Sequence, residues 1–178
     1  EEAITHYKQA LRIDPWLAET HSNLGLVLAR QGRQKEAIAH YKETVRIDPE
    51  DAGAHNNLGV ALVGQGKIEE AIAHYENALR QQPNYLEATI KLGTHYLRMK
   101  RKALAAGQFN RAVEINDKIV DAYLGLATAQ KLAKFTHDAI GTLSLAAAIQ
   151  PNSSMLFAET ATLKFQEGFR NNLPFENE

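Results

Sequence analysis

The sequence predicts an all-α solenoid built from stacked helix–turn–helix repeats. The chain repeats itself with a period of 34 residues, and the blocks 18–51 and 52–85 share 16 identical residues when they are aligned without a gap. Apolar residues recur three and four positions apart, which is the spacing of a buried helix face. No segment alternates apolar and polar residues with period two, so strands are not expected.

Glycine and proline divide each repeat in the same way. Gly32 and Gly66 separate the two helices within a repeat. Prolines separate one repeat from the next, at Pro49, Pro83 and Pro151. Proline cannot continue the preceding helix, but it suits the turn and the start of the following helix. Asp117 stands at the proline position of the third repeat.

The repeat frame divides the chain from end to end. Residues 1–17 are predicted to hold the second helix of a repeat whose first helix is missing, so the N-terminus looks cut. Four full repeats follow, at 18–51, 52–85, 86–119 and 120–153. Residues 154–169 are predicted to form a terminal or capping helix in which Phe157 and Ala161 keep the register. Residues 170–178 are predicted to form a tail.

Small and large residues alternate where the helices must pack. The small ones are Gly25, Gly59, Gly93 and Ala127 in the first helices and Ala37, Ala71, Ala105 and Ala139 in the second. The large ones are Leu24, Leu58, Leu92 and Leu126, then Tyr41, Tyr75, Phe109 and Leu143. Small against large lets helices approach to about 8–10 Å. One helix pair buries too little apolar surface to be stable, so neighbouring repeats must stack.

This pattern resembles the tetratricopeptide repeat (TPR) family, whose 34-residue unit places Leu-Gly, an alanine, an aromatic residue and a proline where this chain has them. The resemblance covers nearly the whole chain and implies a right-handed superhelix. Departures are His21 and His55 where the family often has tryptophan, Asp117 for proline, and Gln130 for a usual tyrosine.

Composition excludes several classes of function. The net charge is −1, so the field that draws a protein to nucleic acid is missing. There is no cysteine, which excludes disulfides and thiolate metal sites. No apolar stretch approaches the roughly 18 residues needed to cross a bilayer. The sequence therefore predicts no nucleic-acid partner and no membrane insertion. A soluble, cytoplasmic protein is slightly favoured, although the compartment stays open.

No catalytic residue, cofactor or metal site is predicted. The segment 64–67 is followed by Ile68, which lacks the hydroxyl that a phosphate loop needs. Equivalent histidines lie one repeat apart, about 8–10 Å in stacked helices, too far to share a metal ion. His21 and His55 are predicted to be packing residues. A solvated stripe is predicted for the others of the series, His6, His40 and His74. The basic cluster Arg98, Lys100, Arg101 and Lys102 is interpreted as a solvated turn, with a contact to an anion or an acidic peptide as the alternative.

The resemblance implies that the first helices line a concave groove, where ligands bind as extended peptides or helices. Eight residues are the main candidates for ligand contact: Asn23, Arg30, Asn56, Asn57, Lys91, Thr94, Arg98 and Lys131. The same faces also carry Glu19, Ser22, Leu26, Val60, Val63, Glu87, Ile90, Asp121, Leu124 and Thr128.

Asn23 and Asn57 are equivalent, and a carboxamide can both donate to and accept from a peptide bond. Their placement resembles the asparagine ladder in the TPR superhelix of O-linked N-acetylglucosamine transferases, but Lys91 and Gly125 occupy the next rungs. The two-carboxylate clamp that grips chaperone C-termini matches only at Asn57 and Lys91. Asn23 and Asn57 are either ligand contacts or polar surface positions of a common repeat.

Three functions are consistent with these features. The first is a protein-interaction scaffold that binds a protein or peptide in the groove. The second is the substrate-recruiting arm of a larger enzyme, such as a glycosyltransferase, whose catalytic domain is absent here. The third is a self-assembling structural subunit. Weak self-association is also predicted through the first helix, where Ile4, Tyr7 and Leu11 lack a covering partner, with the tail residues Phe169, Leu173 and Phe175 as the other candidate surface.

Overall fold

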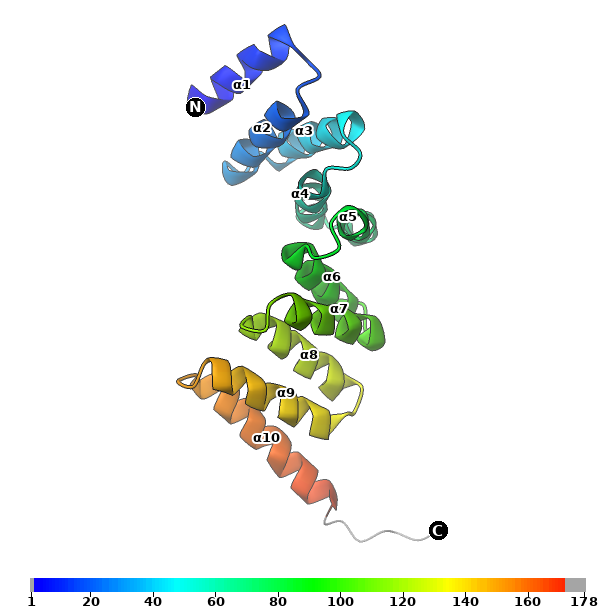
Figure 1. Cartoon of the computed structure of the whole chain (residues 1–178), viewed down its shortest axis with the longest axis vertical. Coiled ribbons are helices and arrows are strands. Elements are labelled where there is room, and N and C mark those ends of the chain that lie inside the picture. The colour runs from blue at the N-terminus through cyan, green and yellow to red at the C-terminus, as the bar shows by residue number, and fades with distance from the viewer. Residues whose placement is uncertain (1, 172–178) are drawn as a thin grey trace. The chain divides into compact units, whose positions relative to one another are not determined.

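The computed structural model describes residues 2–171, and within that range it contains ten α-helices and no strand (Figure 1). The helices are α1 (Glu2–Ile13), α2 (Ala18–Arg30), α3 (Gln34–Ile47), α4 (Ala52–Val63), α5 (Ile68–Gln81), α6 (Leu86–Arg98), α7 (Lys102–Ile115), α8 (Val120–Leu132), α9 (Thr136–Ile149) and α10 (Ser154–Asn171). The predicted all-α solenoid is confirmed. In this part of the chain, every helix is too short or too polar to span a bilayer.

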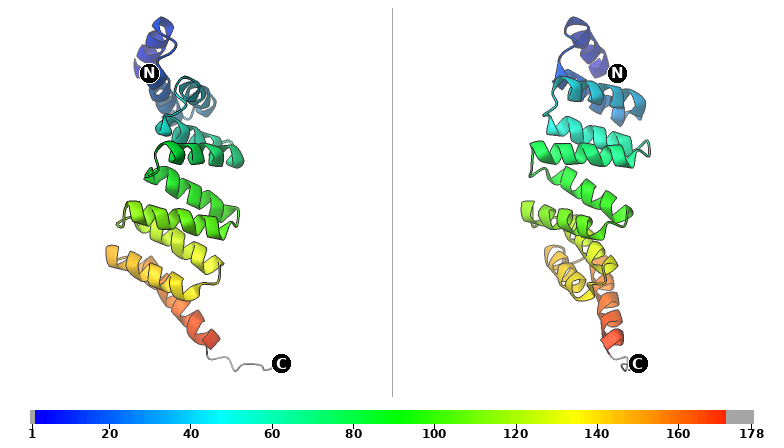
Figure 2. Two further views of the ribbon diagram at one scale, coloured as in Figure 1. Left: turned by 45° about the vertical axis from the view of Figure 1, so that its right-hand side comes forward. Right: turned by 90° about the vertical axis from the view of Figure 1, so that its right-hand side faces the viewer.

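The chain forms two compact units, Glu1–Lys91 and Leu92–Glu178, with the boundary inside α6. In unit 1, α2 packs against α3 and α4 packs against α5, while α1 contacts α2 and α3 contacts α4. In unit 2, α8 packs between α7 and α9, and α10 packs against α9. The left view of Figure 2 shows α8 and α9 side by side, joined by a short turn.

A left-handed residue ends the first helix of each full repeat. It is Gly32 (φ 77°) after α2 and Gly66 (φ 75°) after α4, as the sequence predicts, and it is Lys100 (φ 58°) after α6 and Lys134 (φ 68°) after α8. The next amide donates to the carbonyl five residues earlier, as Phe135 N does to Gln130 O at 2.9 Å. These bonds satisfy carbonyls that the helix leaves open.

The α2–α3 and α4–α5 pairs each close around one aromatic ring and one glycine. A Cβ placed on Gly25 would lie 2.7 Å from Cε1 of Tyr41, and one on Gly59 would lie 2.8 Å from Cε1 of Tyr75. No side chain larger than hydrogen fits at either position without displacing the ring. The predicted packing of small against large residues is confirmed at these positions.

The last helix does not bury Phe157 and Ala161, the residues that keep the repeat register. Leu156 and Leu163 of α10 are buried in the unit 2 core with Tyr123 and Leu143, whereas Phe157 is 55% exposed. Phe157 is equivalent to His21, which faces the second helix of its own repeat, and no helix follows α10 within the described residues. The helix also continues to Asn171, past its predicted end at residue 169. The rest of the predicted tail lies outside the described residues.

The N-terminal helix is better covered than predicted. Ile4 is only 5% exposed, and Tyr7 and Leu11 are half-buried, because α1 packs against α2. The exposed apolar side chains lie at the following turn, where Ile13 is 87% and Trp16 is 63% exposed. The face predicted to drive self-association is therefore largely buried within unit 1.

Candidate functional site

The first helices of unit 1 form a pocket with a volume of about 340 Å³ at the predicted groove. Its lining comes from α2, α3, α4, the turn after α4, and α6: Leu26, Ala29, Gln34, Tyr41, Asn57, Val60, Ala61, Gly64 and Glu87. Four of these residues, Leu26, Asn57, Val60 and Glu87, are among those that the resemblance to the TPR family places in the groove. The structure brings them together at one site.

The pocket combines an apolar floor with polar groups at its margin. Leu26 is 37% and Val60 is 41% exposed, so both present aliphatic surface to a ligand. Asn57 is half-buried beside them and Glu87 is exposed. Burial raises the pKa of Tyr41, so its hydroxyl stays neutral at physiological pH. Burial, with a smaller contribution from the nearby Glu87 carboxylate, raises the pKa of Tyr75 to about 12.

The other predicted contacts of unit 1 lie in different environments. Arg30 and Lys91 are exposed, and within the described residues neither forms an ion pair. Asn23 is half-buried and does not line the pocket. Asn56 is only 1% exposed, so its side chain belongs to the interior of unit 1 and not to the groove surface. Its polarity made it look like a surface residue in the sequence.

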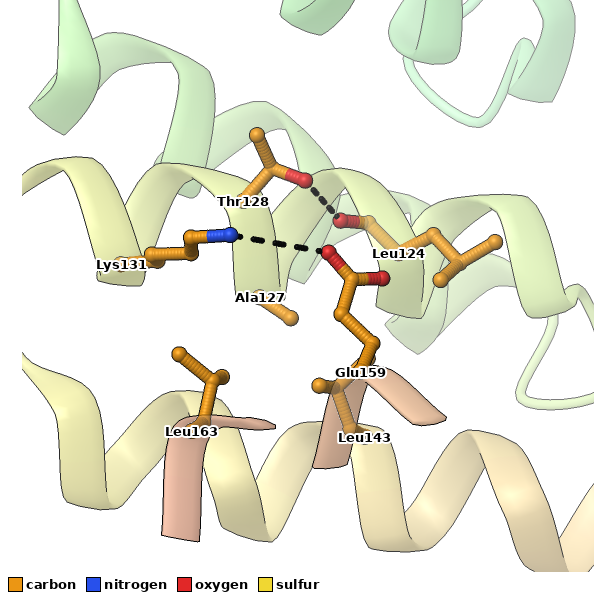
Figure 3. A pocket seen from close by; sticks show the side chains of 7 residues that line it. All are labelled: Leu124, Ala127, Thr128, Lys131, Leu143, Glu159 and Leu163. Atoms are coloured by element: carbon orange, nitrogen blue, oxygen red, sulfur yellow. Dashed lines mark hydrogen bonds and ion pairs between the residues drawn. The ribbon is translucent and has the colours of Figure 1, made fainter. Parts of the chain in front are cut away.

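The predicted contacts of unit 2 do not form an open site. Thr94 is half-buried and Arg98 is exposed. Lys131 Nζ lies 3.7 Å from Glu159 Oε1 of α10, above a cavity of only about 10 Å³ (Figure 3). A space of that size holds about one water molecule. Glu159 was missed in the sequence, although the 34-residue frame places it at the same position as Asn23 and Asn57.

The residue type at the position of Asn23 and Asn57 therefore differs from one repeat to the next along the chain. Asn23 and Asn57 are followed by Lys91, then Gly125, then Glu159. A Cβ on Gly125 would lie 2.3 Å from Cε1 of Phe109, so the ring of Phe109 occupies the place where a fourth ladder side chain would stand. A continuous amide ladder is sterically excluded in unit 2.

Two histidine pairs were also missed. His21 Nδ1 lies 2.9 Å from His40 Nδ1, and His55 Nδ1 lies 2.9 Å from His74 Nδ1. His21 and His55 are buried, as predicted, but His40 and His74 are half-buried and paired instead of forming a solvated stripe. The prediction compared histidines one repeat apart, whereas the contacts join residues 19 apart within one repeat. The recurrence of that spacing was the available signal.

The basic cluster lies where it was predicted, at the turn between α6 and α7. Lys100 takes the left-handed conformation of that turn, and Arg98, Lys100 and Arg101 are exposed. Within residues 2–171, no three side chains of histidine, cysteine, aspartate or glutamate are grouped closely enough to hold a metal ion.

Family models identify the class of protein that this repeated geometry defines. A TPR repeat model matches residues 1–32 and 28–66, and a tetratricopeptide repeat model matches residues 56–118. The chain belongs to the tetratricopeptide repeat family. Proteins of this family generally act as non-catalytic scaffolds that bind proteins or peptides. No curated protein sequence matches the chain.

Solved structures of several TPR proteins resemble the chain. A crystal structure of MamA is 26% identical with a TM-score of 0.79, and the match covers 83% of this chain and 86% of that one. MamA 41-end from Desulfovibrio magneticus RS-1 is 21% identical with a TM-score of 0.77, covering 85% of each chain. YrrB, a TPR protein with an unusual peptide-binding site, is 20% identical with a TM-score of 0.82, covering 91% of this chain and 84% of that one.

Proposed function

We propose that the chain is a protein-interaction scaffold that binds an extended peptide in the groove of unit 1, with an anchoring side chain in the pocket between α2, α4 and α6. The observation that carries this proposal is the meeting of Leu26, Val60, Asn57 and Glu87 at one pocket of about 340 Å³. Ligand sites are typically concave and apolar, with a few polar groups that fix orientation.

The side chains divide the recognition between apolar burial and backbone hydrogen bonding. An aliphatic residue of the ligand that covers Leu26 and Val60 removes apolar surface from water at about 25 cal/mol per Å². The Asn57 carboxamide can donate to a peptide carbonyl and accept from a peptide amide. This combination selects an apolar anchor in an extended segment without specifying its neighbours.

Charge at the margin of the groove adds orientation. Arg30 and Lys91 are exposed cations, and Glu87 is an exposed anion at the pocket. A ligand with an acidic group on the Lys91 side and a basic group on the Glu87 side would pair with both. Such exposed pairs contribute little affinity, about 0–1 kcal/mol each, and act mainly on orientation.

The structural neighbours support this proposal only at the level of the fold. YrrB has a peptide-binding site built on the same repeat architecture. The resemblance to the asparagine ladder of glycosyltransferase arms receives no such support, because Phe109 and Gly125 interrupt the ladder. The scaffold function is therefore favoured over the substrate-recruiting arm.

A peptide selected from a displayed random library on the immobilised chain provides the ligand for the test. Calorimetry should show that Val60→Asp abolishes binding, because it places a charge on the apolar floor. Asn57→Ala should weaken binding by about 0.5–1.5 kcal/mol, the range for a neutral hydrogen bond. Lys91→Ala should weaken an acidic peptide by only about 0–1 kcal/mol, because Lys91 is exposed to solvent.

Glu69→Ala is the matched control, since Glu69 is exposed on α5 and does not line the pocket. It should bind like the parent chain. A peptide that binds Val60→Asp and Asn57→Ala as tightly as the parent, but loses affinity for the Glu69 variant, would place the site on the other face.

A further inference from the structure

Each histidine pair of unit 1 links a turn and two helices through hydrogen bonds of its ring nitrogens. His21 Nε2 lies 3.1 Å from the carbonyl oxygen of Pro15, so Nε2 carries a proton and donates it. The Nδ1 of His21 is then unprotonated and accepts the Nδ1–H of His40 at 2.9 Å. The pattern recurs one repeat later, where His55 Nε2 lies 3.1 Å from the Pro49 carbonyl oxygen.

This arrangement holds a single proton between the two Nδ1 atoms. A first added proton can go to Nε2 of His40, which keeps the hydrogen bond to His21 but places a positive charge at a half-buried site and so weakens the closed state. A second must go to Nδ1 of His21, where two N–H groups and two positive charges would then face each other. His21 and His55 are 8% and 5% exposed, so water cannot replace the lost hydrogen bond unless the helices separate.

The surrounding charges only partly oppose this effect. The groups that act on His40 are His21 on α2, Lys8 on α1, and Glu36 and Glu43 on its own helix. Burial is the largest cause that lowers the pKa of His40 below 6.5, followed by the neighbouring His21.

His74 has a closely similar environment. The groups that act on it are His55 on α4, Lys42 on α3 and Glu70 on its own helix. Burial, and then the neighbouring His55, lower its pKa below 6.5. In both pairs, glutamates of the same helix act in the opposite direction but do not reverse the shift.

We propose that the two histidine pairs are pH-sensitive clasps, which close α2 on α3 and α4 on α5 when their imidazoles are neutral and release them on acidification. The device is local. The equivalent positions of the α8–α9 pair hold Tyr123 and Thr142, and Thr142 donates to Gln130 at 2.8 Å. None of these three side chains is a histidine, the residue type whose ordinary pKa lies between pH 5 and 8.

The direction of the pH effect follows from the lowered pKa values. The unfolded or opened histidine binds a proton more readily than the closed one, so acidification favours opening. The stabilisation is fully present above about pH 6.5 and declines as the pH falls through the lowered pKa values of His40 and His74.

Hydrogen exchange of the full chain at pH 7.5 and pH 5.5, corrected for the intrinsic pH dependence of exchange, tests the proposal. Protection of α2–α5 should fall several-fold relative to that of α8–α9 at the lower pH. The difference should vanish in the fourfold variant His21→Tyr, His40→Thr, His55→Tyr and His74→Thr, which installs the residues of the α8–α9 pair. It should persist in His6→Gln, because His6 shares the register of His40 but is exposed.

Equal loss of protection in both helix groups, or a preferential loss that survives in the fourfold variant, would overturn the proposal. A second measurement does not depend on how the variant folds. Nitrogen-15 spectra of the parent chain at pH 7.5 should show His21 and His55 as the Nε2–H tautomer and His40 and His74 as the Nδ1–H tautomer. Any other assignment removes the shared proton on which the clasp depends.

Discussion

At the scale of single residues, Phe109 of α7 is closely packed between two glycines. Its ring lies between two glycines, so that a Cβ on Gly93 would come within 3.0 Å of Cζ and one on Gly125 within 2.3 Å of Cε1. The ring cannot move away from one glycine without approaching the other. Gly125 is therefore a packing requirement, and this requirement removes a ligand-contact position from the fourth repeat.

Gly125→Ala should destabilise the chain by about 1–3 kcal/mol, the range for an overpacked core. Denaturant unfolding measures the change, and Gly107→Ala is the control, because nothing lies within 4 Å of a Cβ at Gly107 in the exposed face of α7. That control should stabilise the chain by about 0.5–1 kcal/mol, since alanine favours a helix over glycine. Recovery of stability in Gly125→Ala combined with Phe109→Leu would assign the cost to the ring. Equal effects at Gly125 and Gly107 would contradict this account.

At this scale, the sequence predicted only those side-chain contacts that appear when equivalent positions of successive repeats are compared. The Gly25–Tyr41 contact recurs at fixed positions in the next repeat, so the pattern of small and large residues predicted it. The His21–His40 contact also recurs, but it joins different positions within one repeat, which a comparison of equivalent residues cannot find. Asn56 was misjudged because the burial of a polar residue depends on neighbouring helices that composition does not specify, whereas Glu159 was missed although the 34-residue frame marks its position.

At the scale of helices, the ends of the first helices show the same turn built from different residues. Gly32 and Gly66 adopt positive φ without steric cost, whereas Lys100 and Lys134 adopt it with a Cβ. All four turns have the same backbone hydrogen bond from an amide to the carbonyl five residues earlier. The turn therefore forms even where glycine, its preferred residue, is absent. The glycines predicted the helix ends of the first two full repeats, and the 34-residue frame predicted the other two.

Lys134→Gly should stabilise the chain. Removing the Cβ relieves about 1–2 kcal/mol of left-handed strain, and the greater entropy of glycine in the unfolded chain takes back about 0.4–1 kcal/mol. A net gain of about 0.5–1 kcal/mol is expected in denaturant unfolding. Lys134→Ala is the control that removes the charge and keeps the Cβ, and it should give no comparable gain. Equal gains in both variants would assign the effect to charge.

At the scale of the whole molecule, stability is distributed along the chain and is not gathered in one core. Each unit has its own buried side chains, with Leu24, Leu28, Leu58 and Leu62 in unit 1 and Leu143, Leu156 and Leu163 in unit 2. In a solenoid, each repeat contacts only its neighbours, so the effect of a mutation decays along the chain. The predicted ligand pocket lies in unit 1, and the small cavity under Lys131 and Glu159 lies in unit 2.

Leu156→Ala tests this distribution because Leu156 is fully buried in the core that α8, α9 and α10 share. The truncation should cost about 2–5 kcal/mol, and hydrogen exchange should show the loss of protection in α8–α10 with that of α2–α5 unchanged. Phe157→Ala is the control on the same helix, and it should cost much less because Phe157 is 55% exposed. A uniform loss of protection from α2 to α10 in the Leu156 variant would show that the chain opens as one cooperative body, in which case the two units do not behave as separate elements of stability.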